Sequence, residues 1–275
     1  MKLAVIKDSA YVKTVVVRDG FVYPLEHVAK QFDVPLSKLI ESQLIESLRQ
    51  YLQFVEWSSV QGRIAIEQAN FIIPQINFQH IFGVGANYVE KAEDLKIIAE
   101  KPVCFLKTSQ CLVGPNDVIT FPKFSQRVSA EGELALIIGK QCFEVTEDEA
   151  LSYVAGYTTA LDFTAKDLRE ENQNFLQLSK LFKGSCSIGP EIQFETQHLA
   201  HLVVETVRNN TVIHQNTVSN MTYSPAFIVA YISKFVTLMP GDIILTGTPG
   251  SFDCEKGDIA ECRVTGLTPL TNQML

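Results

Sequence analysis

Hydrophobic and polar residues follow one another along this chain mostly in short runs that are typical of β-strands. Residues 1–8 and 11–18 are rich in β-branched side chains, and Asp19-Gly20 separates them from a third run at residues 21–24. An Asp-Gly pair between two such runs predicts a hairpin turn. Further apolar runs lie at residues 81–88, 102–107, 112–115, 118–122, 131–139, 156–162 and 238–249. Many short strands with few helices predict a mainly β, or α+β, architecture.

A few stretches have the three- to four-residue apolar spacing of a helix. Apolar residues recur in this way over residues 36–52, directly after Pro35, and predict one amphipathic helix. Two further helices are expected at residues 146–155 and 225–235.

The helix after Pro35 and the first strands together make a small α+β unit, which a connector at residues 72–77 separates from the rest. We therefore expect a small N-terminal α+β domain at residues 1–72 and a larger β-rich domain at residues 73–275. A chain of 275 residues can bury one large core with such an appendage.

Composition narrows the class of protein. The chain is 46% hydrophobic and 20% charged, which is ordinary for a globular protein, and its net charge of −8 disfavours binding to nucleic acid. No apolar run approaches the roughly 20 residues of a membrane span, and the first residues lack the layout of a signal peptide. The six cysteines form no CxxC pair. We expect a cytoplasmic protein that binds neither nucleic acid nor membrane, with six reduced cysteines that serve in packing.

The most informative stretch is Glu131-Gly132-Glu133, which runs directly into the apolar residues 134–138. Residues two apart on a strand face the same way, so the two carboxylates lie side by side at the mouth of a buried strand. Their repulsion needs compensation, which a hard divalent cation such as Mg²⁺ or Ca²⁺ provides. Asp162, at the end of another apolar run, is a second acid in such a place. The alternative is that the two glutamates are solvated at a strand end.

Several motifs then follow one another in a recognisable order. They are Gly-Ala-Asn87-Tyr88, Phe105-Leu106-Lys107, Leu112-Val113-Gly114-Pro115, Glu131-Gly132-Glu133-Leu134, Val154-Ala155-Gly156-Tyr157 with Asp162, Lys180-Leu181-Phe182, and Pro240 to Pro249 with Thr246-Gly247-Thr248. As a set they resemble the fumarylacetoacetate hydrolase family from about residue 70 to the end. The first domain is similar to the small leading domain of bacterial members.

The resemblance implies a mixed β-sandwich roll and a homodimer. It also implies a metal site at Glu131, Glu133 and Asp162 that takes Mg²⁺ or Mn²⁺, with Ca²⁺ as a further candidate. The family acts on small 2-oxo or β-diketo acids by C–C bond hydrolysis, decarboxylation or keto–enol isomerisation. A hydrolase such as an acylpyruvate hydrolase, a lyase such as an oxaloacetate decarboxylase, and an isomerase all remain open.

The resemblance assigns roles to residues outside the metal site as well. Lys180 matches the family lysine that faces the substrate, where it pairs with a carboxylate or relays a proton. Gly247 and Thr248 match a turn that offers an N–H and a hydroxyl to the substrate, and we place Asn87 and Tyr88 among the substrate-binding residues.

The chain departs from the family where hydrolytic members carry a water-activating His and Glu. Lys91 stands in place of the histidine and Asp94 in place of the glutamate. Lys91 could act as an electrostatic clamp, a proton donor or a base. The alternative is that Lys91 and Asp94 form a solvated pair on a surface helix. Lys183, His214 and Asn220 are further departures. Since decarboxylation and isomerisation need no activated water, they fit this replacement better than hydrolysis does. The alternative function is a degenerate member that binds metal and ligand without turnover.

Overall fold

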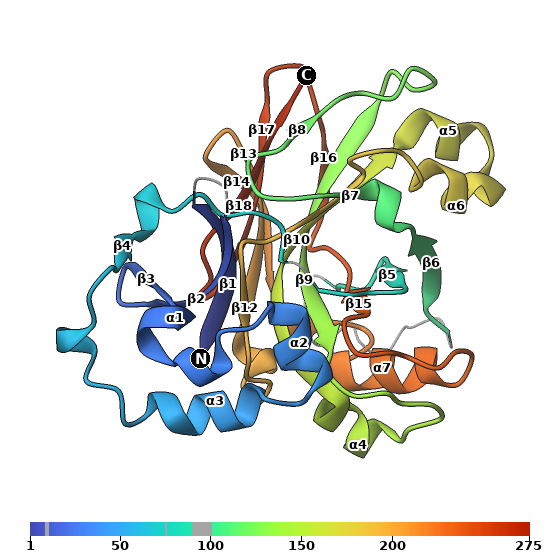
Figure 1. Cartoon of the computed structure of the whole chain (residues 1–275). Helices are drawn as coiled ribbons and strands as arrows, with labels where there is room; N and C mark the ends of the chain where they lie inside the picture. Colours follow the sequence, from blue (N-terminus) through green and yellow to red (C-terminus); the bar gives the residue numbers. More distant parts are fainter. Residues whose placement is uncertain (9–10, 75, 90–100) are drawn as a thin grey trace.

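The computed structural model describes residues 1–8, 11–74, 76–89 and 101–275. Two β-sheets dominate it, as expected for a mainly β, α+β fold (Figure 1). The large sheet has the strand order β4-β3-β2-β1-β12-β10-β9-β15-β5-β6, with β7, β11 and β16 attached at its side, and the small sheet has the order β14-β13-β17-β18-β8.

The strands are mostly short, with two long exceptions in the middle of the large sheet. In chain order they are β1 Lys2–Asp8, β2 Tyr11–Arg18, β3 Phe21–Pro24, β4 Ile64–Ala65, β5 Ile81–Gly85, β6 Val103–Lys107, β7 Leu112–Val113, β8 Val118–Ile119, β9 Val128–Ile138, β10 Val154–Ala165, β11 Cys186–Ile188, β12 Glu191–Gln193, β13 Val203–Arg208, β14 Thr211–Thr217, β15 Ile243–Leu245, β16 Ser251–Asp253, β17 Ile259–Val264 and β18 Leu270–Met274.

The helices are short and lie around the sheets. They are α1 Leu25–Val28, α2 Leu36–Glu41, α3 Ile45–Leu52, α4 Glu147–Ala150, α5 Lys166–Glu171, α6 Leu176–Ser179 and α7 Pro225–Ser233. The helix predicted at residues 225–235 is confirmed, and the Ser224 hydroxyl caps its first turn by accepting the Phe227 N–H. The helix predicted at residues 146–155 is shorter, since β10 begins at Val154. None of the described helices has the length and apolar character that crossing a membrane requires.

The single helix predicted over residues 36–52 is wrong, because α2 ends at Glu41 and α3 begins at Ile45. Gln43 adopts a positive φ of 54°, a conformation that stops a helix, and the Leu44 N–H bonds back to the Leu39 carbonyl. The apolar spacing continues through this break because both helices pack on the same core, which contains Leu36, Leu39, Ile40, Leu48 and Leu52.

Strand β1 pairs with β12, so the N-terminal strands continue the large sheet. The division of the chain at residues 72 and 73 stays a prediction. The six cysteines are free thiols, but Cys104 is exposed, so its assignment to packing was wrong. It lies on β6, the last strand at one edge of the sheet, where alternate side chains point outward.

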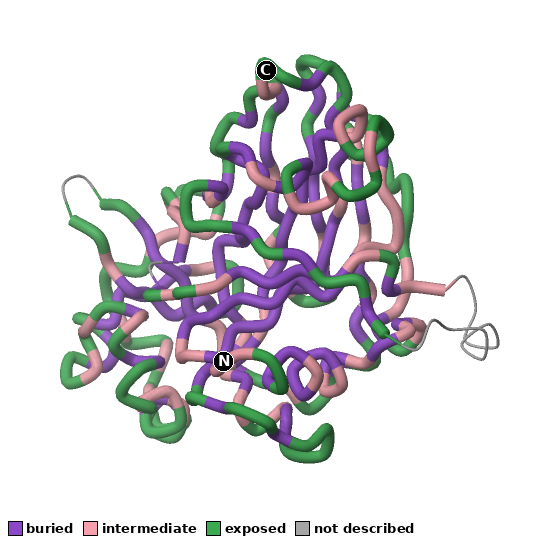
Figure 2. The backbone as a smooth tube through the Cα atoms, turned by 90° about the vertical axis from the view of Figure 1, so that its right-hand side faces the viewer, coloured by how far each residue is buried: buried purple, intermediate pink, exposed green. Residues whose placement is uncertain are grey.

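The two sheets pack against each other along β9 and β10, which contact β13 and β17 of the small sheet. Buried residues run through the centre of the molecule, and exposed ones lie at its outside (Figure 2). Leu134 and Leu136 on β9 share one core with Val204 on β13 and Cys262 on β17. Gly132 is the point of closest approach, because a Cβ there would lie 2.7 Å from the Glu205 carbonyl oxygen. This packing holds the middle of β9 rigidly against the small sheet.

Candidate functional site

Three carboxylates meet on one face of the β9–β10 pair. In the antiparallel register Glu131 lies directly opposite Asp162, and Glu133 follows two residues later on β9, so it faces the same way. One oxygen of each lies within 4.8 Å of the others. Asp162 and Glu133 are buried, and Glu131 is partly exposed. The strand register therefore brings together the residues that the sequence analysis selected as metal ligands.

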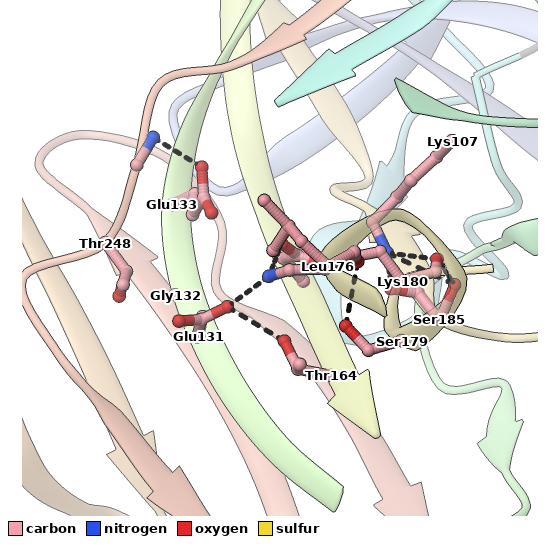
Figure 3. A network of polar contacts seen from close by, with 12 residues as sticks. Lys107, Glu131, Gly132, Glu133, Thr164, Leu176, Ser179, Lys180, Ser185 and Thr248 are labelled. Atoms are coloured by element: carbon pink, nitrogen blue, oxygen red, sulfur yellow. Dashed lines mark hydrogen bonds and ion pairs between the residues drawn. The ribbon is translucent and has the colours of Figure 1, made fainter. Parts of the chain in front are cut away.

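Lys180 places its ammonium group between two of these carboxylates (Figure 3). Its Nζ donates to Glu131 Oε2 over 2.7 Å and to Asp162 Oδ2 over 2.5 Å. Lys180 follows α6, which is fixed to edge strand β6 because the Gln177 side-chain amide bonds both the N–H and the carbonyl of Leu106. Burial alone would lower the pKa of Lys180, but the charges of Asp162 and Glu131 outweigh it and raise this pKa well above its usual value. Lys180 is therefore protonated.

Sequence reasoning missed a second lysine at the cluster. Lys107 ends β6, is 3% exposed, and its Nζ lies 2.7 Å from Asp162 Oδ1. The same Nζ donates to the carbonyl oxygens of Lys180 and Ser185 over 2.9 and 2.8 Å (Figure 3). The sequence does contain an indication of this role. Lys107 stands two residues after Phe105 on a strand, so it occupies the same inward-facing side as that buried ring.

Glu133 is held from the opposite side by the turn after β15. Its Oε2 accepts the Gly247 N–H over 2.6 Å. Burial first, and then the charges of Asp162 and Glu131, raise the pKa of Glu133 well above its usual value. Gly247 has a φ of +101°, and a Cβ there would lie 2.7 Å from the Asn87 Cβ, so this approach requires glycine.

The cluster fits a divalent cation. All three side chains offer carboxylate oxygens, which hard cations such as Mg²⁺ and Mn²⁺ prefer. The contact between Asp162 Oδ1 and Lys107 is not aligned as a hydrogen bond, so this buried oxygen has no donor among the described residues. Burial of Glu133, and then the charges of Asp162 and Glu131, disfavour its ionised form and raise its pKa, and a bound cation would offset both effects. Glu131, Glu133 and Asp162 can therefore hold a divalent metal ion.

The carboxylates open into a cleft of ≈ 280 Å³. Its polar lining comes from Glu131, Glu133, Arg169, Lys180, Thr248 and Ser251, and its apolar wall from Val84, Val103, Phe105 and Leu176. Arg169 is a further residue that sequence reasoning missed, since nothing in its local pattern separates it from a surface arginine. Thr248 lines the cleft as predicted, and its hydroxyl donates to the Gly250 carbonyl over 2.9 Å. The volume suits a small molecule.

Asn87 and Tyr88 lie near the cluster but contribute none of the cleft lining described above. The buried Asn87 amide donates to the carbonyls of Thr246 and Tyr223 and accepts the Tyr223 N–H. It therefore fixes the strand end that precedes Gly247. The Tyr88 hydroxyl is buried and has no hydrogen-bond partner among the described residues. Burial, then the nearby Glu133 charge, raises the pKa of Tyr88. Direct substrate contact by either residue stays a prediction.

Two of the remaining departures from the family pattern, His214 and Asn220, make contacts that the structure describes. Lys91 and Asp94 lie outside the described residues. His214 on β14 packs against Gly250, and its Nε2 lies 3.1 Å from the Ser251 carbonyl oxygen, so it supports the turn that carries Thr248. The Asn220 carbonyl accepts the Val89 N–H over 3.2 Å.

Comparison with known proteins places this arrangement in a family. Residues 80–275 match the model of the fumarylacetoacetate (FAA) hydrolase C-terminal family. The chain is 32% identical over 219 residues to the mitochondrial oxaloacetate tautomerase Fahd2a of Rattus norvegicus, a match that covers 76% of this chain and 70% of the rat protein.

Solved structures agree. Fumarylacetoacetate hydrolase from Exiguobacterium antarcticum superposes with a TM-score of 0.85 at 27% identity, over 100% of this chain and 99% of that one. Fumarylpyruvate hydrolase from Pseudomonas aeruginosa, solved in complex with Mn²⁺ and pyruvate, superposes with a TM-score of 0.66 at 26% identity, over 76% of this chain and 92% of that one. The ordered motifs, the fold and these matches together show that this chain is a member of the fumarylacetoacetate hydrolase family of enzymes.

Proposed function

We propose that this protein is a divalent-metal-dependent enzyme that interconverts the keto and enol forms of a small 2-oxo acid, with oxaloacetate as the leading candidate. The observation that carries the proposal is the joint placement of Glu131, Glu133, Asp162 and Lys180 at one end of a cleft of ≈ 280 Å³. Its similarity to an oxaloacetate tautomerase supports the choice of substrate.

Mg²⁺ or Mn²⁺ would be held by the three carboxylates, and when bound it supplies a docking point for a 2-oxo carboxylate and stabilises negative charge on the enolate oxygen. The structure of a related hydrolase with Mn²⁺ and pyruvate supports Mn²⁺ as a candidate.

The side chains of this protein contribute the remaining chemistry. Conversion of the enol to the keto form adds a proton to the carbon next to the ketone and removes one from the enol oxygen. The Lys180 ammonium lies 2.7 Å from Glu131 at the edge of the cluster, so it can give a proton to that carbon, while the enol proton passes to water and Lys180 regains a proton from water. Val84, Phe105 and Leu176 exclude water from one wall of the cleft and so strengthen these charge interactions.

One observation favours tautomerisation over C–C bond hydrolysis. Hydrolysis requires a group that activates water, most often a histidine. Within the part of the chain that the structure describes, the cleft lining contains no histidine, and its carboxylates are those that would bind the metal. Moving a proton between carbon and oxygen needs no activated water.

The test is to follow the decay of enol-oxaloacetate by its ultraviolet absorbance with Mg²⁺ or Mn²⁺. Release of pyruvate and hydrolysis of acetylpyruvate are measured in parallel. We expect metal-dependent decay of the enol that is much faster than either other reaction. We also expect a loss of at least about 100-fold in Glu133→Gln and no change in the control Glu170→Gln, whose carboxylate lies outside the cleft. Faster hydrolysis of acetylpyruvate, or enol decay independent of metal, would contradict the proposal.

A further inference from the structure

Arg169 is the second cationic side chain that lines the cleft, and its situation differs from that of Lys180. Lys180 contacts two carboxylates of the cluster, within 2.7 Å. Arg169 is exposed on α5, and among the described residues it has no hydrogen-bond or ion-pair partner. A cation that faces a small cleft with its donors unused is available to a ligand.

The helix that carries Arg169 is fixed in place by its other charged residues. Lys166 pairs with Asp253 on β16 over 2.7 Å, and Glu170 pairs with Arg127 over 2.6 Å. Asp167 accepts the Ser125 hydroxyl over 2.5 Å and the Gln126 N–H over 2.8 Å. The backbone of Arg169 is therefore anchored to the strands that form the site.

The contacts of the two cations distinguish their roles in the cleft. The carboxylate cluster with Lys180 is the place at which a 2-oxo carboxylate docks. No ion pair joins Arg169 to Glu131, Glu133 or Asp162 within the described structure, so its guanidinium is not a counterion of that cluster. A guanidinium is planar and binds a carboxylate through two parallel hydrogen bonds, which an ammonium does not.

We propose that Arg169 binds a second carboxylate of the substrate and so makes this enzyme selective for 2-oxo dicarboxylic acids over 2-oxo monocarboxylic acids. This inference rests on the proposed function, because it assumes that the first carboxylate docks at the metal cluster. The apolar wall formed by Val84, Val103 and Phe105 lowers the local dielectric and strengthens the contact between guanidinium and carboxylate.

The experiment uses ligands that differ only in the second carboxylate. Oxaloacetate is paired with 2-oxobutyrate, and 2-oxoglutarate with 2-oxopentanoate. Each is titrated into Mn²⁺-loaded protein, and binding is read from the water-proton relaxation rate of the bound Mn²⁺, a signal that does not depend on measuring catalytic activity. In at least one pair, we expect wild type to bind the diacid at least about 10-fold more tightly than the monoacid. A hydrogen bond between charged groups changes the binding affinity by about this factor.

Arg169→Gln should remove this preference. Its affinity for the diacid should fall at least about 10-fold, and its affinity for the monoacid should change less than about twofold. Arg169→Lys should keep only part of the preference, because an ammonium lacks the planar pair of donors. Arg18→Gln, which removes the same charge on β2, is the matched control and should behave as wild type.

The outcomes separate the two proposals. Equal affinity of wild type for diacid and monoacid, or equal weakening of both in Arg169→Gln, overturns the role of Arg169 and leaves the proposed function standing. If no 2-oxo acid changes the Mn²⁺ signal of wild type, the proposed function and the inference built on it both fail.

Discussion

Two ionic clusters lie close together, one on the neighbouring strands β9 and β10 and the other just beyond the ends of these strands, yet they differ strongly in burial. The inner cluster comprises Lys107, Glu131, Glu133, Asp162 and Lys180, and the outer cluster comprises Arg127, Lys166, Glu170 and Asp253. Strand β16 pairs Ser251 with Glu131 at the inner cluster and Asp253 with Ser129 at the outer one. Side chains of the inner cluster are at most 18% exposed, whereas those of the outer cluster are between 37% and 52% exposed.

The difference in burial sets what each cluster does. In the outer cluster, water solvates each charge whether or not it is paired, so the pairs add little stability and serve to hold α5. In the inner cluster, the charges have lost most of their hydration, and each depends on the others. Burying carboxylates and lysines together is an unfavourable way to stabilise a fold. Such a buried group of charges is typical of a site that binds a ligand, as proposed for this cleft.

The largest effect is expected from Lys107→Met in the metal-free protein. This change leaves Asp162 Oδ1 without its cationic neighbour at 2.7 Å. Removing one partner of a buried pair lowers the free energy of unfolding by about 3–5 kcal/mol, which urea denaturation measures. The double variant Lys107→Met/Asp162→Asn should lose less than the sum of the two single variants. If Lys107→Met has a free energy of unfolding within about 1 kcal/mol of wild type, and the losses of the two single variants add in the double variant, Lys107 and Asp162 are not coupled.

A smaller effect should distinguish two glycines with similar backbone angles. Gly247, at the inner cluster, has a φ of +101°, and Gly257, in an open turn, has a φ of +92°. A Cβ would lie 2.7 Å from the Asn87 Cβ at Gly247 but would meet nothing within 4 Å at Gly257. Gly247→Ala should therefore be about 1–3 kcal/mol less stable than Gly257→Ala, because overpacking adds to the same backbone strain. Equal losses in thermal unfolding would contradict the tight packing at Gly247.

The smallest effect is expected at the outer cluster. The hydrogen bond from Lys166, followed by that from Arg127, lowers the pKa of Asp253 below 3.8. A lowered pKa stabilises the fold above pH 3.8, and this contribution is lost as the pH falls through the pKa of the folded state. Asp253→Asn should thus lower the melting temperature by about 2 °C or less at pH 7, with a difference that vanishes at acidic pH and in 1 M salt. A larger loss that persists in salt would mean that the two clusters are alike.

The sequence predicts the inner cluster well because strand alternation is local. Glu131 and Glu133 must share a face, and their position before a buried strand marks them as unusual. The predicted family and the mainly β fold are confirmed. That Asp162 lies opposite Glu131 follows only from the strand register. The sequence analysis selected Asp162 as an acid at the end of an apolar run and took its place in the metal site from the resemblance.

The residues that sequence analysis missed depend on tertiary structure. Lys107 contacts Asp162 only because β6 and α6 bring the ends of distant segments together, and Arg169 reaches the cleft through the placement of α5. The break at Gln43 left the apolar spacing unchanged, so periodicity did not reveal it. The predicted homodimer is not tested by contacts within one chain and stays a prediction.

The most direct test of the central claim is a calorimetric titration of the metal-free protein with Mn²⁺. Wild type and the outer-cluster variant Glu170→Gln should each bind one ion with the same affinity. Glu133→Gln should bind at least about 10-fold more weakly, because it loses one of three charged ligands. If Glu133→Gln binds Mn²⁺ as tightly as wild type does, the inner cluster is not the metal site and this account of the cleft is wrong.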